Sequence, residues 1–300
     1  MELLSRPVLL IANPAARRTA ALLPRAREAF AAAGVTCELA PTERPGHAAE
    51  LAAGIAAREA RDFAAVYVLG GDGTVMEVLG SLAHSGIPVG IVPGGTGNLV
   101  ARSLGIPLDT SRAVHALVHG RARAMDLGIT GGGHRFAFSA GAGVDSRMIA
   151  ETSARAKRSF GAAAYAFTAL RCALAPRPFE LRAVVDGVVV ERTASAVMVA
   201  NSGGVLNDLI TLGPGIRNDD GLLDICIFSP RGSIQAAAVG WRLFTARFDG
   251  HPAMFHRAAR EFRVDCDPPQ ILQADGELLG ETPFEARVEA GAASVLVPDP

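Results

Sequence analysis

Lysine is almost absent from this chain of 300 residues, because Lys157 is the only one and every other basic residue is an arginine or a histidine. A Walker A loop needs a Gly-Lys-Ser/Thr triplet, whereas Lys157 follows Ala156 and precedes Arg158. Lys157 also lacks the Val-Ala-x-Lys strand setting of a protein kinase. The sequence therefore excludes a Walker A nucleotidase and a protein kinase, and it offers no convincing Schiff-base lysine.

Charge excess and paired cysteines are lacking as well. The formal net charge is −1, which gives no support to nucleic-acid binding. The four cysteines, Cys37, Cys172, Cys226 and Cys266, form no C-x-x-C pair, so neither a zinc site nor a thioredoxin-type site is indicated. We expect buried, reduced thiols in a cytoplasmic protein.

Long apolar runs are missing too. The uncharged stretch around position 160 extends only over residues 159–170, well short of the ~20 residues of a spanning helix. Residues 1–7 carry an early acid, Glu2, and no basic-then-apolar signal pattern. We therefore expect a soluble protein without a transmembrane segment.

What is present is a composition suited to a folded core, with 49% hydrophobic and 20% charged residues. The first 120 residues alternate short apolar runs with alanine-rich stretches of helical character. Continuous apolar strands separated by helices indicate a parallel sheet that is covered on both faces. Strands are predicted over 8–12, 35–39, 65–69 and 87–92, and helices over 17–33, 47–61 and from the Gly-rich segment after 69 to Gly86.

The pattern changes after Arg121 to short runs rich in Val, Ile, Phe and Thr that are separated by Gly and Asp turns. Such punctuation is typical of a β-sandwich. Strands are predicted over 135–139, 181–185, 188–190, 196–200, 222–228, 261–266, 271–274, 284–288 and 294–297, with helical inserts over 150–175 and 233–248. We thus predict an α/β domain over 1–125 and a β-sandwich domain over 126–300, whose last strand is free to return to the first domain.

Two glycine-rich loops share one design. Gly70-Gly71-Asp72-Gly73-Thr74 and Pro93-Gly94-Gly95-Thr96-Gly97-Asn98 each follow a buried strand and open a helix. Glycine permits positive φ and lets backbone N–H groups approach a phosphate at the positive end of the helix dipole. The alternative is that both loops are only tight turns from a strand into a helix and bind no phosphate. This alternative explains their shared design less well. Neither loop fits the dinucleotide pattern G-x-G-x-x-G.

Asp72 makes the first loop more specific. A carboxylate among phosphate-binding amides would repel the ligand unless a cation lies between them. Mg²⁺ is commonly held by one or two carboxylates together with substrate phosphates. The alternative is an ordinary Gly-Asp-Gly turn. The loop context favours the metal role.

These loops, with Glu77, resemble the catalytic domain of the diacylglycerol kinase and sphingosine kinase superfamily, and in particular its soluble bacterial two-domain lipid kinases. Further segments in the same order extend the resemblance along nearly the whole chain: Asn13-Pro14, Thr42 with Gly46-His47-Ala48 and Glu50, Asp126-Leu127-Gly128, Asn218–Asp224 and Asp275-Gly276-Glu277. The resemblance implies an NAD kinase-like, doubly wound first domain, a β-sandwich second domain, and ATP with Mg²⁺ as the cofactors.

The resemblance also implies roles for single residues. Asp72 and Asp126 would hold the nucleotide Mg²⁺, and the Asp220 carboxylate with the Arg217 and Leu222 carbonyls would hold a structural Mg²⁺. Asp72, Asp275 and Glu277 would be catalytic. ATP binding falls to Asn13, Thr42, Gly70, Gly71, Asp72, Gly73, Thr74, Glu77, Gly94, Gly95, Thr96 and Asn98.

Two positions depart from the pattern of the superfamily. Many relatives read Gly-Thr-x-Asn-Asp, and Leu99 stands here in place of the last aspartate. Met76 stands where asparagine is common. The missing carboxylate leaves open how Asp72 and Asp126 share the nucleotide metal, and it keeps a non-catalytic nucleotide- or lipid-binding protein as an alternative.

The late acidic pair allows two interpretations. On an extended chain Asp275 and Glu277 would lie on one face, with Gly276 permitting a bend, whereas Asp-Gly is equally typical of a solvated hairpin turn. The resemblance favours catalysis, with either carboxylate accepting the proton of an acceptor hydroxyl. With no lysine in the loops, charge neutralisation must come from Mg²⁺, loop amides and an arginine that the sequence does not identify.

Three further patterns have ordinary explanations beside functional ones. His115 and His119 share a helix face like a zinc pair, but a solvated last helical turn explains them better. Phe160, Ala164, Phe167, Arg171 and Leu174 recur at helical spacing, which fits core packing or a lipid groove. Residues 241–248 mix aromatics with arginines, as at a membrane interface, but form no longer stripe.

The sequence therefore predicts an ATP- and Mg²⁺-dependent lipid kinase that phosphorylates diacylglycerol, a sphingoid base or a related lipid alcohol. Its partner would be a lipid substrate at the membrane surface, with no nucleic acid. A peripheral position at the inner face of the membrane and a homodimer are both left open. The rival enzyme is an NAD kinase or another polar-alcohol kinase of the same superfamily.

Overall fold

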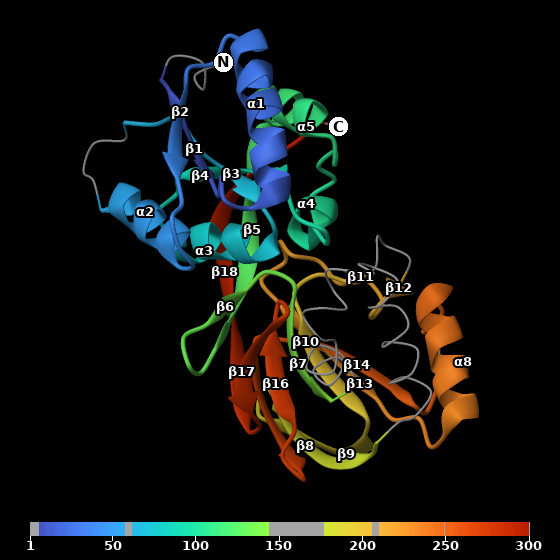
Figure 1. Cartoon of the computed structure of the whole chain (residues 1–300). Coiled ribbons are helices and arrows are strands. Elements are labelled where there is room, and N and C mark those ends of the chain that lie inside the picture. Colours follow the sequence, from blue (N-terminus) through green and yellow to red (C-terminus); the bar gives the residue numbers. More distant parts are fainter. Residues whose placement is uncertain (1–5, 58–61, 144–176, 206–209, 249, 300) are drawn as a thin grey trace. The chain divides into compact units, whose positions relative to one another are not determined.

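The computed structural model describes residues 6–57, 62–143, 177–205, 210–248 and 250–299 (Figure 1). These residues form two compact units, Met1–Met125 with Gly291–Pro300, and Asp126–Ala290. The predicted helix over 150–175, with Lys157, Cys172 and the spacing from Phe160 to Leu174, lies outside the described residues.

The first unit is built on a parallel sheet. Its strands β1 (Val8–Ala12), β2 (Cys37–Pro41), β3 (Val66–Gly70), β4 (Pro88–Pro93) and the end of β18 (Phe284–Val297) follow the order β2-β1-β3-β4-β18. β1 and β3 are buried at every position, as strands covered on both faces must be. The strand predicted at 35–39 is shifted by two residues in the structure.

Three helices connect the first four strands: α1 (Arg17–Ala32), α2 (His47–Ala56) and α3 (Asp72–Ser81). Two more, α4 (Leu99–Ser103) and α5 (Thr110–Val118), follow β4. The chain moves from β1 outward to β2, then returns past β1 to β3 and β4. Right-handed crossovers place α1 on one face of the sheet, and α2 and α3 on the other. The contacts agree, because α1 packs on α5 and α2 packs on α3. The doubly wound sheet predicted from the sequence is confirmed.

Aromatic packing fixes the centre of this sheet. The Phe30 ring of α1 meets Tyr67 of β3 edge-on, with ring centroids 4.8 Å apart. Gly90 of β4 leaves the room that the Tyr67 ring occupies, since a Cβ there would lie 2.4 Å from a ring carbon. Burial raises the pKa of the Tyr67 hydroxyl, so this side chain stays neutral in the core.

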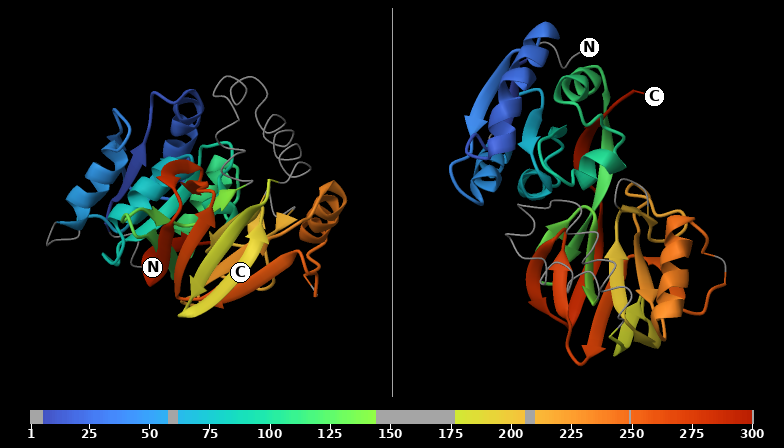
Figure 2. Two further views of the ribbon diagram at one scale, coloured as in Figure 1. Left: turned by 90° about the horizontal axis from the view of Figure 1, so that it is seen from below. Right: turned by 45° about the vertical axis from the view of Figure 1, so that its right-hand side comes forward.

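The second unit is a β-sandwich. One sheet has the order β14-β13-β10-β7-β16-β17, and the other contains β18-β15-β8-β9 with the β5–β6 pair (Figure 2). The strands are β5 (Arg121–Thr130), β6 (Arg135–Phe136), β7 (Ser139–Gly143), β8 (Phe179–Val185), β9 (Val188–Ala194), β10 (Ala196–Ala200), β13 (Leu223–Phe228), β14 (Met254–Ala259), β15 (Glu261–Asp267), β16 (Ile271–Ala274) and β17 (Glu277–Glu281).

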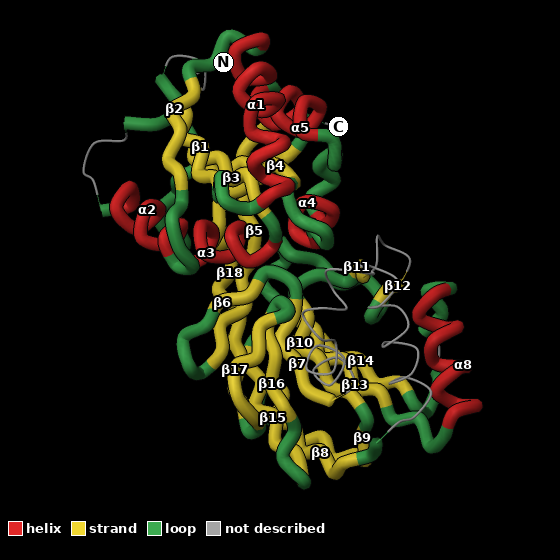
Figure 3. Tube along the Cα trace, in the orientation of Figure 1, coloured by secondary structure: helices red, strands yellow, loops and turns green. Residues whose placement is uncertain are grey.

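The two sheets face each other across one apolar core. Alternate residues point inward: Val197 and Ile225 come from the first sheet, and Leu181 and Val264 from the second. The short pair β11 (Gly204–Val205) and β12 (Ile210–Thr211) and the helix α8 (Ser233–Phe244) lie outside this core (Figure 3). Among the residues described in this unit, α8 is the one helix.

Several predicted boundaries are wrong. The strands expected at 284–288 and 294–297 are one continuous strand, because the chain passes through Gly291 at φ 59° without turning back. The predicted strand 135–139 covers β6 and only the first residue of β7. β5, β14 and β17 and the two-residue strands β11 and β12 have no predicted counterpart, since charged or glycine residues interrupt the apolar patterns of the first three and the last two are very short. The helix expected over 233–248 ends at Phe244.

The cysteines are thiols where they are described. Cys226 and Cys266 are buried as expected, and Cys37 is only partly buried. Burial raises the pKa of Cys37 and of Cys266 to about 11, so both stay protonated near neutral pH. No helix in the described part of the chain is long and apolar enough to cross a membrane.

Candidate functional site

The chain reverses its direction of winding between β1 and β3. In open α/β sheets ligands bind at such a switch point, outside the carboxyl ends of the strands. Asn13 directly follows β1, and Gly71 with Asp72 follows β3. Asn13 Oδ1 accepts hydrogen bonds from the backbone N–H groups of Ala15 and Ala16 at 3.0 and 3.2 Å, and so closes the turn after β1.

Thr42 and Glu77 lie around the same edge of the sheet. Thr42 follows β2, is buried, and donates its backbone N–H to the Ala12 carbonyl at 2.8 Å. Glu77 lies on α3, and its Oε1 accepts the N–H of Gly46 at 3.1 Å, which ties α3 to the start of α2. The sequence-predicted nucleotide residues of the first unit thus gather at the carboxyl ends of β1 to β4.

The two glycine loops are in direct backbone contact. The Gly94 N–H donates to the Gly70 carbonyl at 2.8 Å. A Cβ on Gly95 would lie 2.6 Å from the Gly71 Cα, and a Cβ on Gly94 would lie 3.1 Å from the Gly70 nitrogen. The expected positive φ is therefore wrong for these glycines, because none of them has one. At Gly94 and Gly95 the close approach of the two loops excludes a side chain.

Asn98 is the one residue of these loops with a positive φ, at 50°. Its side chain closes the second loop on itself, because Oδ1 accepts the Gly95 N–H at 2.8 Å and Nδ2 donates to the Gly95 carbonyl at 3.0 Å. Arg102 of α4 donates through Nε to the Gly97 carbonyl at 3.0 Å. Thr96 and Gly97 are exposed at the tip of the loop.

Asp72 lies where the two loops meet. It is the first residue of α3, where the helix dipole favours an anion. Its Oδ1 accepts the Val100 N–H at 3.4 Å. Burial raises the pKa of the Asp72 carboxyl, and hydrogen bonds from the backbone of Val100, Leu99 and Asn98 oppose that rise.

Because Gly97 has no side chain, one side of the other carboxylate oxygen, Oδ2, is left uncovered. A Cβ at position 97 would lie 2.9 Å from Asp72 Oδ2, so a side chain there would cover this oxygen. A partly buried carboxylate beside backbone amides and a helix N-terminus is a donor set that suits Mg²⁺ bound to a phosphate. The residues present therefore fit the predicted metal.

Asp126 has a different setting, in the second unit. It is buried, its Oδ2 accepts the Gly221 N–H at 2.7 Å, and its own N–H donates to the Asn218 carbonyl at 2.7 Å. Asn201 Nδ2 donates to the carbonyls of Asp126 and Ala137 at 2.8 and 2.9 Å. The structure thus uses Asp126 to hold the loop over 217–222.

That loop contains the predicted structural metal site. Asp220 Oδ1 accepts the Leu222 N–H at 3.1 Å, and the Arg217 side chain pairs with Asp219 at 3.0 Å. In the described residues no three His, Cys, Asp or Glu side chains cluster as metal ligands. An ion here would depend on the Arg217 and Leu222 carbonyls with Asp220.

Asp275 and Gly276 are the two central residues of a tight hairpin between β16 and β17. Both have positive φ, at 47° and 91°, and Ala274 pairs with Glu277 across the turn. Of the two interpretations that the sequence allows, the hairpin turn is therefore the one observed, and the extended segment is not. The Asp-Gly pair adopts the turn because only glycine and short polar residues tolerate such angles.

The Asp275 carboxylate is nevertheless held tightly. Oδ2 accepts the N–H of Ala137 at 2.7 Å, and Oδ1 accepts the N–H groups of Phe138 and Ser139 at 3.0 and 2.9 Å. Its own N–H donates to the Ser139 carbonyl at 3.0 Å. Asp275 thereby anchors the hairpin to the start of β7, while Glu277, one residue past the turn, is exposed.

Sequence reasoning missed Asn201 and the amides of residues 137–139. Asn201 is fully buried, and its Oδ1 has no hydrogen-bond partner. A signal existed, because an asparagine directly after the apolar strand 196–200 is a typical polar residue at a strand end. Nothing in the sequence marks backbone amides as partners of an acid some 140 positions away.

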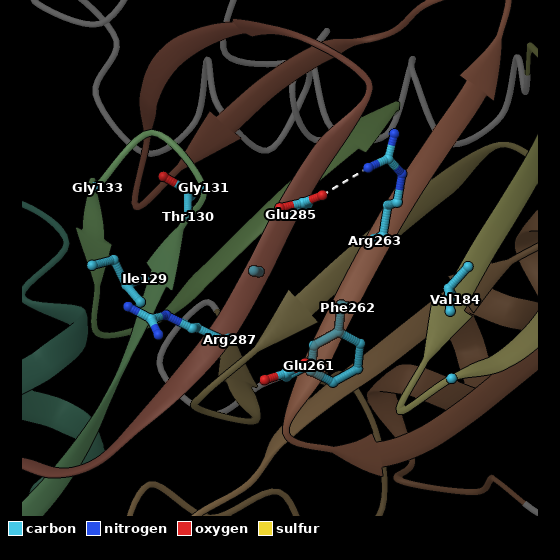
Figure 4. Close-up of a pocket in the computed structure, with 12 residues that line it drawn as sticks. Ile129, Thr130, Gly131, Gly133, Val184, Glu261, Phe262, Arg263, Glu285 and Arg287 are labelled. Atoms are coloured by element: carbon cyan, nitrogen blue, oxygen red, sulfur yellow. Dashed lines mark hydrogen bonds and ion pairs between the residues drawn. The ribbon is translucent and has the colours of Figure 1, made fainter.

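A surface cavity of about 590 Å³ lies elsewhere on the second unit, over β15 and β18 (Figure 4). Arg263 and Glu285 line it and pair with each other at 2.7 Å. It contains none of the residues predicted from the sequence to form the site. Its charged groups balance one another on a solvated sheet face.

Family models cover nearly the whole chain. The diacylglycerol kinase catalytic domain matches residues 7–130, and the YegS C-terminal NAD kinase beta sandwich-like domain matches residues 138–297. Both matches agree with the predicted fold class, an α/β domain followed by a β-sandwich domain.

Curated relatives point the same way. A diacylglycerol kinase of Mycobacterium tuberculosis is 30% identical over 255 residues, which cover 81% of this chain and 80% of that protein. A diacylglycerol kinase of Bacillus subtilis is 28% identical and covers 77% of each chain. An uncharacterized protein of Synechocystis sp. is 29% identical over 233 residues. The matched residues make up 76% of this chain and 54% of that longer protein.

Solved structures share the architecture. The crystal structure of a candidate diacylglycerol kinase from Bacillus anthracis str. Sterne superposes with a TM-score of 0.83 at 26% identity, over 98% of this chain and 96% of that one. A second structure described as a diacylglycerol kinase from the same organism has a TM-score of 0.76 at 23% identity, which supports the fold alone.

Proposed function

Because this chain belongs to the diacylglycerol kinase family of lipid kinases, we propose that it transfers the γ-phosphoryl group of ATP to a hydroxyl of diacylglycerol or a related lipid alcohol. The observation that supports this most directly is the partly buried carboxylate of Asp72, which lies at the start of α3 where the two glycine loops meet at the switch point of the sheet. ATP is the phosphoryl donor that the family implies.

The first unit binds the nucleotide in this proposal. The Gly94 and Gly95 N–H groups are already bonded within the loops, so we assign the phosphates to the other N–H groups of the loops and of the first turn of α3. Asn13, Thr42, Glu77 and Asn98 shape the surrounding turns. Bound to Asp72, Mg²⁺ would neutralise charge on the β- and γ-phosphate oxygens. Arg102, which holds the Gly97 carbonyl, is our choice for the arginine that adds positive charge at this loop.

Glu277 is the better choice for the proton acceptor. The Asp275 carboxylate already accepts three backbone N–H groups, and a base with occupied lone pairs takes a proton poorly. In the proposed step the acceptor hydroxyl gives its proton to Glu277 while its oxygen bonds to the γ-phosphorus. The bond from that phosphorus to the β,γ-bridging oxygen breaks, and ADP leaves.

We further propose that the 217–222 loop binds a structural Mg²⁺ through Asp220 and the Arg217 and Leu222 carbonyls, with Asp126 holding the loop in place through Gly221. In this proposal Asp126 positions the loop rather than the nucleotide metal. The unpartnered Oδ1 of Asn201, next to Asp126, is a polar group that an ordered water would satisfy.

The test is phosphorylation from labelled ATP with diacylglycerol, sphingosine and NAD supplied side by side. We expect a labelled lipid, and loss of turnover in Asp72→Asn with the fold retained by circular dichroism. Product with NAD alone would replace the proposal by the NAD kinase alternative. Tight ATP binding without any product would favour the non-catalytic alternative that Leu99 leaves open.

A further inference from the structure

Helix α8 exposes an apolar face to solvent. Ile234, Trp241 and Phe244, which we call the α8 face, have 87%, 63% and 49% of their surface exposed. Ile234 and Trp241 are two turns apart on one side, and the Trp241 and Phe244 rings stack with centroids 5.7 Å apart. Ala236 and Val239 are buried on the opposite side, so the helix uses a different face to pack on its own unit. Exposed apolar patches of this kind usually have a partner.

The residues around the α8 face are basic. Residues 229–248 contain Arg231, Arg242 and Arg247 and no aspartate or glutamate. Gly232 occupies the N-cap of α8 and supplies no capping side chain, so the positive end of the helix dipole is not neutralised there by an acid. Charge and apolar surface therefore occur together on one helix.

A cavity of about 630 Å³ opens at the start of α8. Arg192, Arg231 and Gly232 line it, together with Ser195, which is 2% exposed and whose Oγ has no hydrogen-bond partner. The Arg192 guanidinium stacks over the Phe255 ring at 4.9 Å. The cavity therefore brings the positive charge of the two arginines and the unpaired hydroxyl of Ser195 to the N-terminal end of α8, the end at which Ile234 lies.

We infer that α8 docks the protein on an anionic lipid surface, with the α8 face in the interfacial layer and the three arginines beside lipid phosphates. Trp and Phe favour the boundary between acyl chains and headgroups, and arginine pairs with phosphate. A second copy of the chain is a poorer partner, because it would bring three more arginines against the first three. Docking goes beyond the proposed kinase reaction and needs no nucleotide.

Trp241 supplies the readout, since it is the only tryptophan of the chain. The full-length protein is mixed, without ATP, with vesicles of phosphatidylglycerol or of phosphatidylcholine. We expect a blue shift of Trp241 emission, and quenching by brominated acyl chains, with phosphatidylglycerol and much less with phosphatidylcholine. Unchanged emission with anionic vesicles overturns the inference.

Variants locate the contact. Ile234→Ser with Phe244→Ser keeps Trp241 as reporter and should lower vesicle partitioning about tenfold or more. Arg231→Gln with Arg242→Gln should lower it about fivefold for each arginine. The matched controls are Val188→Ser with Val189→Ser, two apolar residues exposed at the β8–β9 turn, and Arg287→Gln, an exposed arginine of β18. Controls that bind as weakly as the α8 variants contradict the docking surface.

Two further outcomes are decisive. A Trp241 shift that depends on protein concentration without vesicles, with dimers that Ile234→Ser abolishes, replaces the lipid by a second copy. Phosphorylation of a detergent-solubilised lipid separates this inference from the kinase proposal. Turnover without vesicle binding contradicts docking alone, and vesicle binding without turnover contradicts the kinase alone.

Discussion

At the scale of single residues, the two aspartates of the proposed site have opposite environments. Asp72 is partly buried, and burial raises the pKa of its carboxyl more than the surrounding backbone N–H groups lower it. Asp275 has three N–H groups on its carboxylate within 3.0 Å. A group held in an unfavourable charged state is typical of a functional site, whereas a fully hydrogen-bonded carboxylate is typical of a structural anchor.

Asp72→Asn should therefore make the protein more stable at neutral pH. Below the unfolded pKa of about 3.9 the carboxyl is neutral in both states, and the wild type bears no burial cost. As the pH rises through the raised pKa of the folded state, ionisation costs the wild type free energy that the amide does not lose. Denaturant unfolding across this pH range should show that the free energy of unfolding of Asp72→Asn, relative to that of the wild type, increases with pH. A wild type whose free energy of unfolding rises with pH relative to that of the variant would contradict this prediction.

Substitutions of the two acids of the hairpin should have different effects: that of Asp275 should lower stability, and that of Glu277 should lower activity. In Asp275→Asn the Nδ2 group faces the Ala137 N–H, so one buried donor is left unsatisfied at a cost of about 1–3 kcal/mol. Asn tolerates the positive φ, so the substitution tests the carboxylate and not the turn.

Glu277→Gln is the matched variant. Glu277 is exposed, so the substitution should change the free energy of unfolding of the protein by less than about 0.5 kcal/mol. Its turnover should fall about 10²–10⁴-fold if it accepts the proton. Measured unfolding and kcat for both variants decide the assignment, and full activity in Glu277→Gln would remove this residue from the reaction.

At the scale of elements, the two glycine loops behave as one unit because their backbones touch. Gly95→Ala would force its Cβ to within 2.6 Å of the Gly71 Cα, so the loops must separate. We expect a loss of about 1–3 kcal/mol in unfolding free energy and weaker ATP binding. Gly54→Ala, in α2 with nothing within 4 Å of the new methyl group, is the control and should stabilise by about 0.5–1 kcal/mol. Equal effects would contradict the loop contact.

The same scale shows what could be read from the sequence. Buried parallel strands such as Val8–Ala12 and the paired glycine loops could be predicted, because each depends on a local apolar run or a local turn. β18 could not, since Gly291 looks like a turn and only pairing with β4 and β15 makes one strand of it. The anchoring of Asp275 by the amides of 137–139 depends on tertiary contact alone.

At the scale of the whole molecule, the first unit is assembled from both ends of the chain. Gly291–Pro300 belongs to it, and Ser294 and Val295 pair in parallel with Pro88 and Val89 of β4. Val295 and Leu296 are fully buried there. Ten residues at the end of the sequence thus complete the sheet on which the proposed nucleotide site is built.

Leu296→Ala should therefore weaken the first unit. Truncation of a fully buried leucine costs about 2–5 kcal/mol. Hydrogen exchange should become faster at the amides of β3 and β4 and stay unchanged at those of β10 and β13. Leu278→Ala, at a half-exposed position of β17, is the control with little expected effect. Faster exchange confined to the second unit would contradict this prediction.

The return of the last strand also sets an order of events during synthesis. Until residues 294–295 have been synthesised, some 200 residues after β4, the outer edge of β4 is unpaired. An open strand edge is prone to pairing with other chains. Residues 284–287 of the same strand pair with β15 of the second unit, so neither unit has all of its strands until β18 has been synthesised.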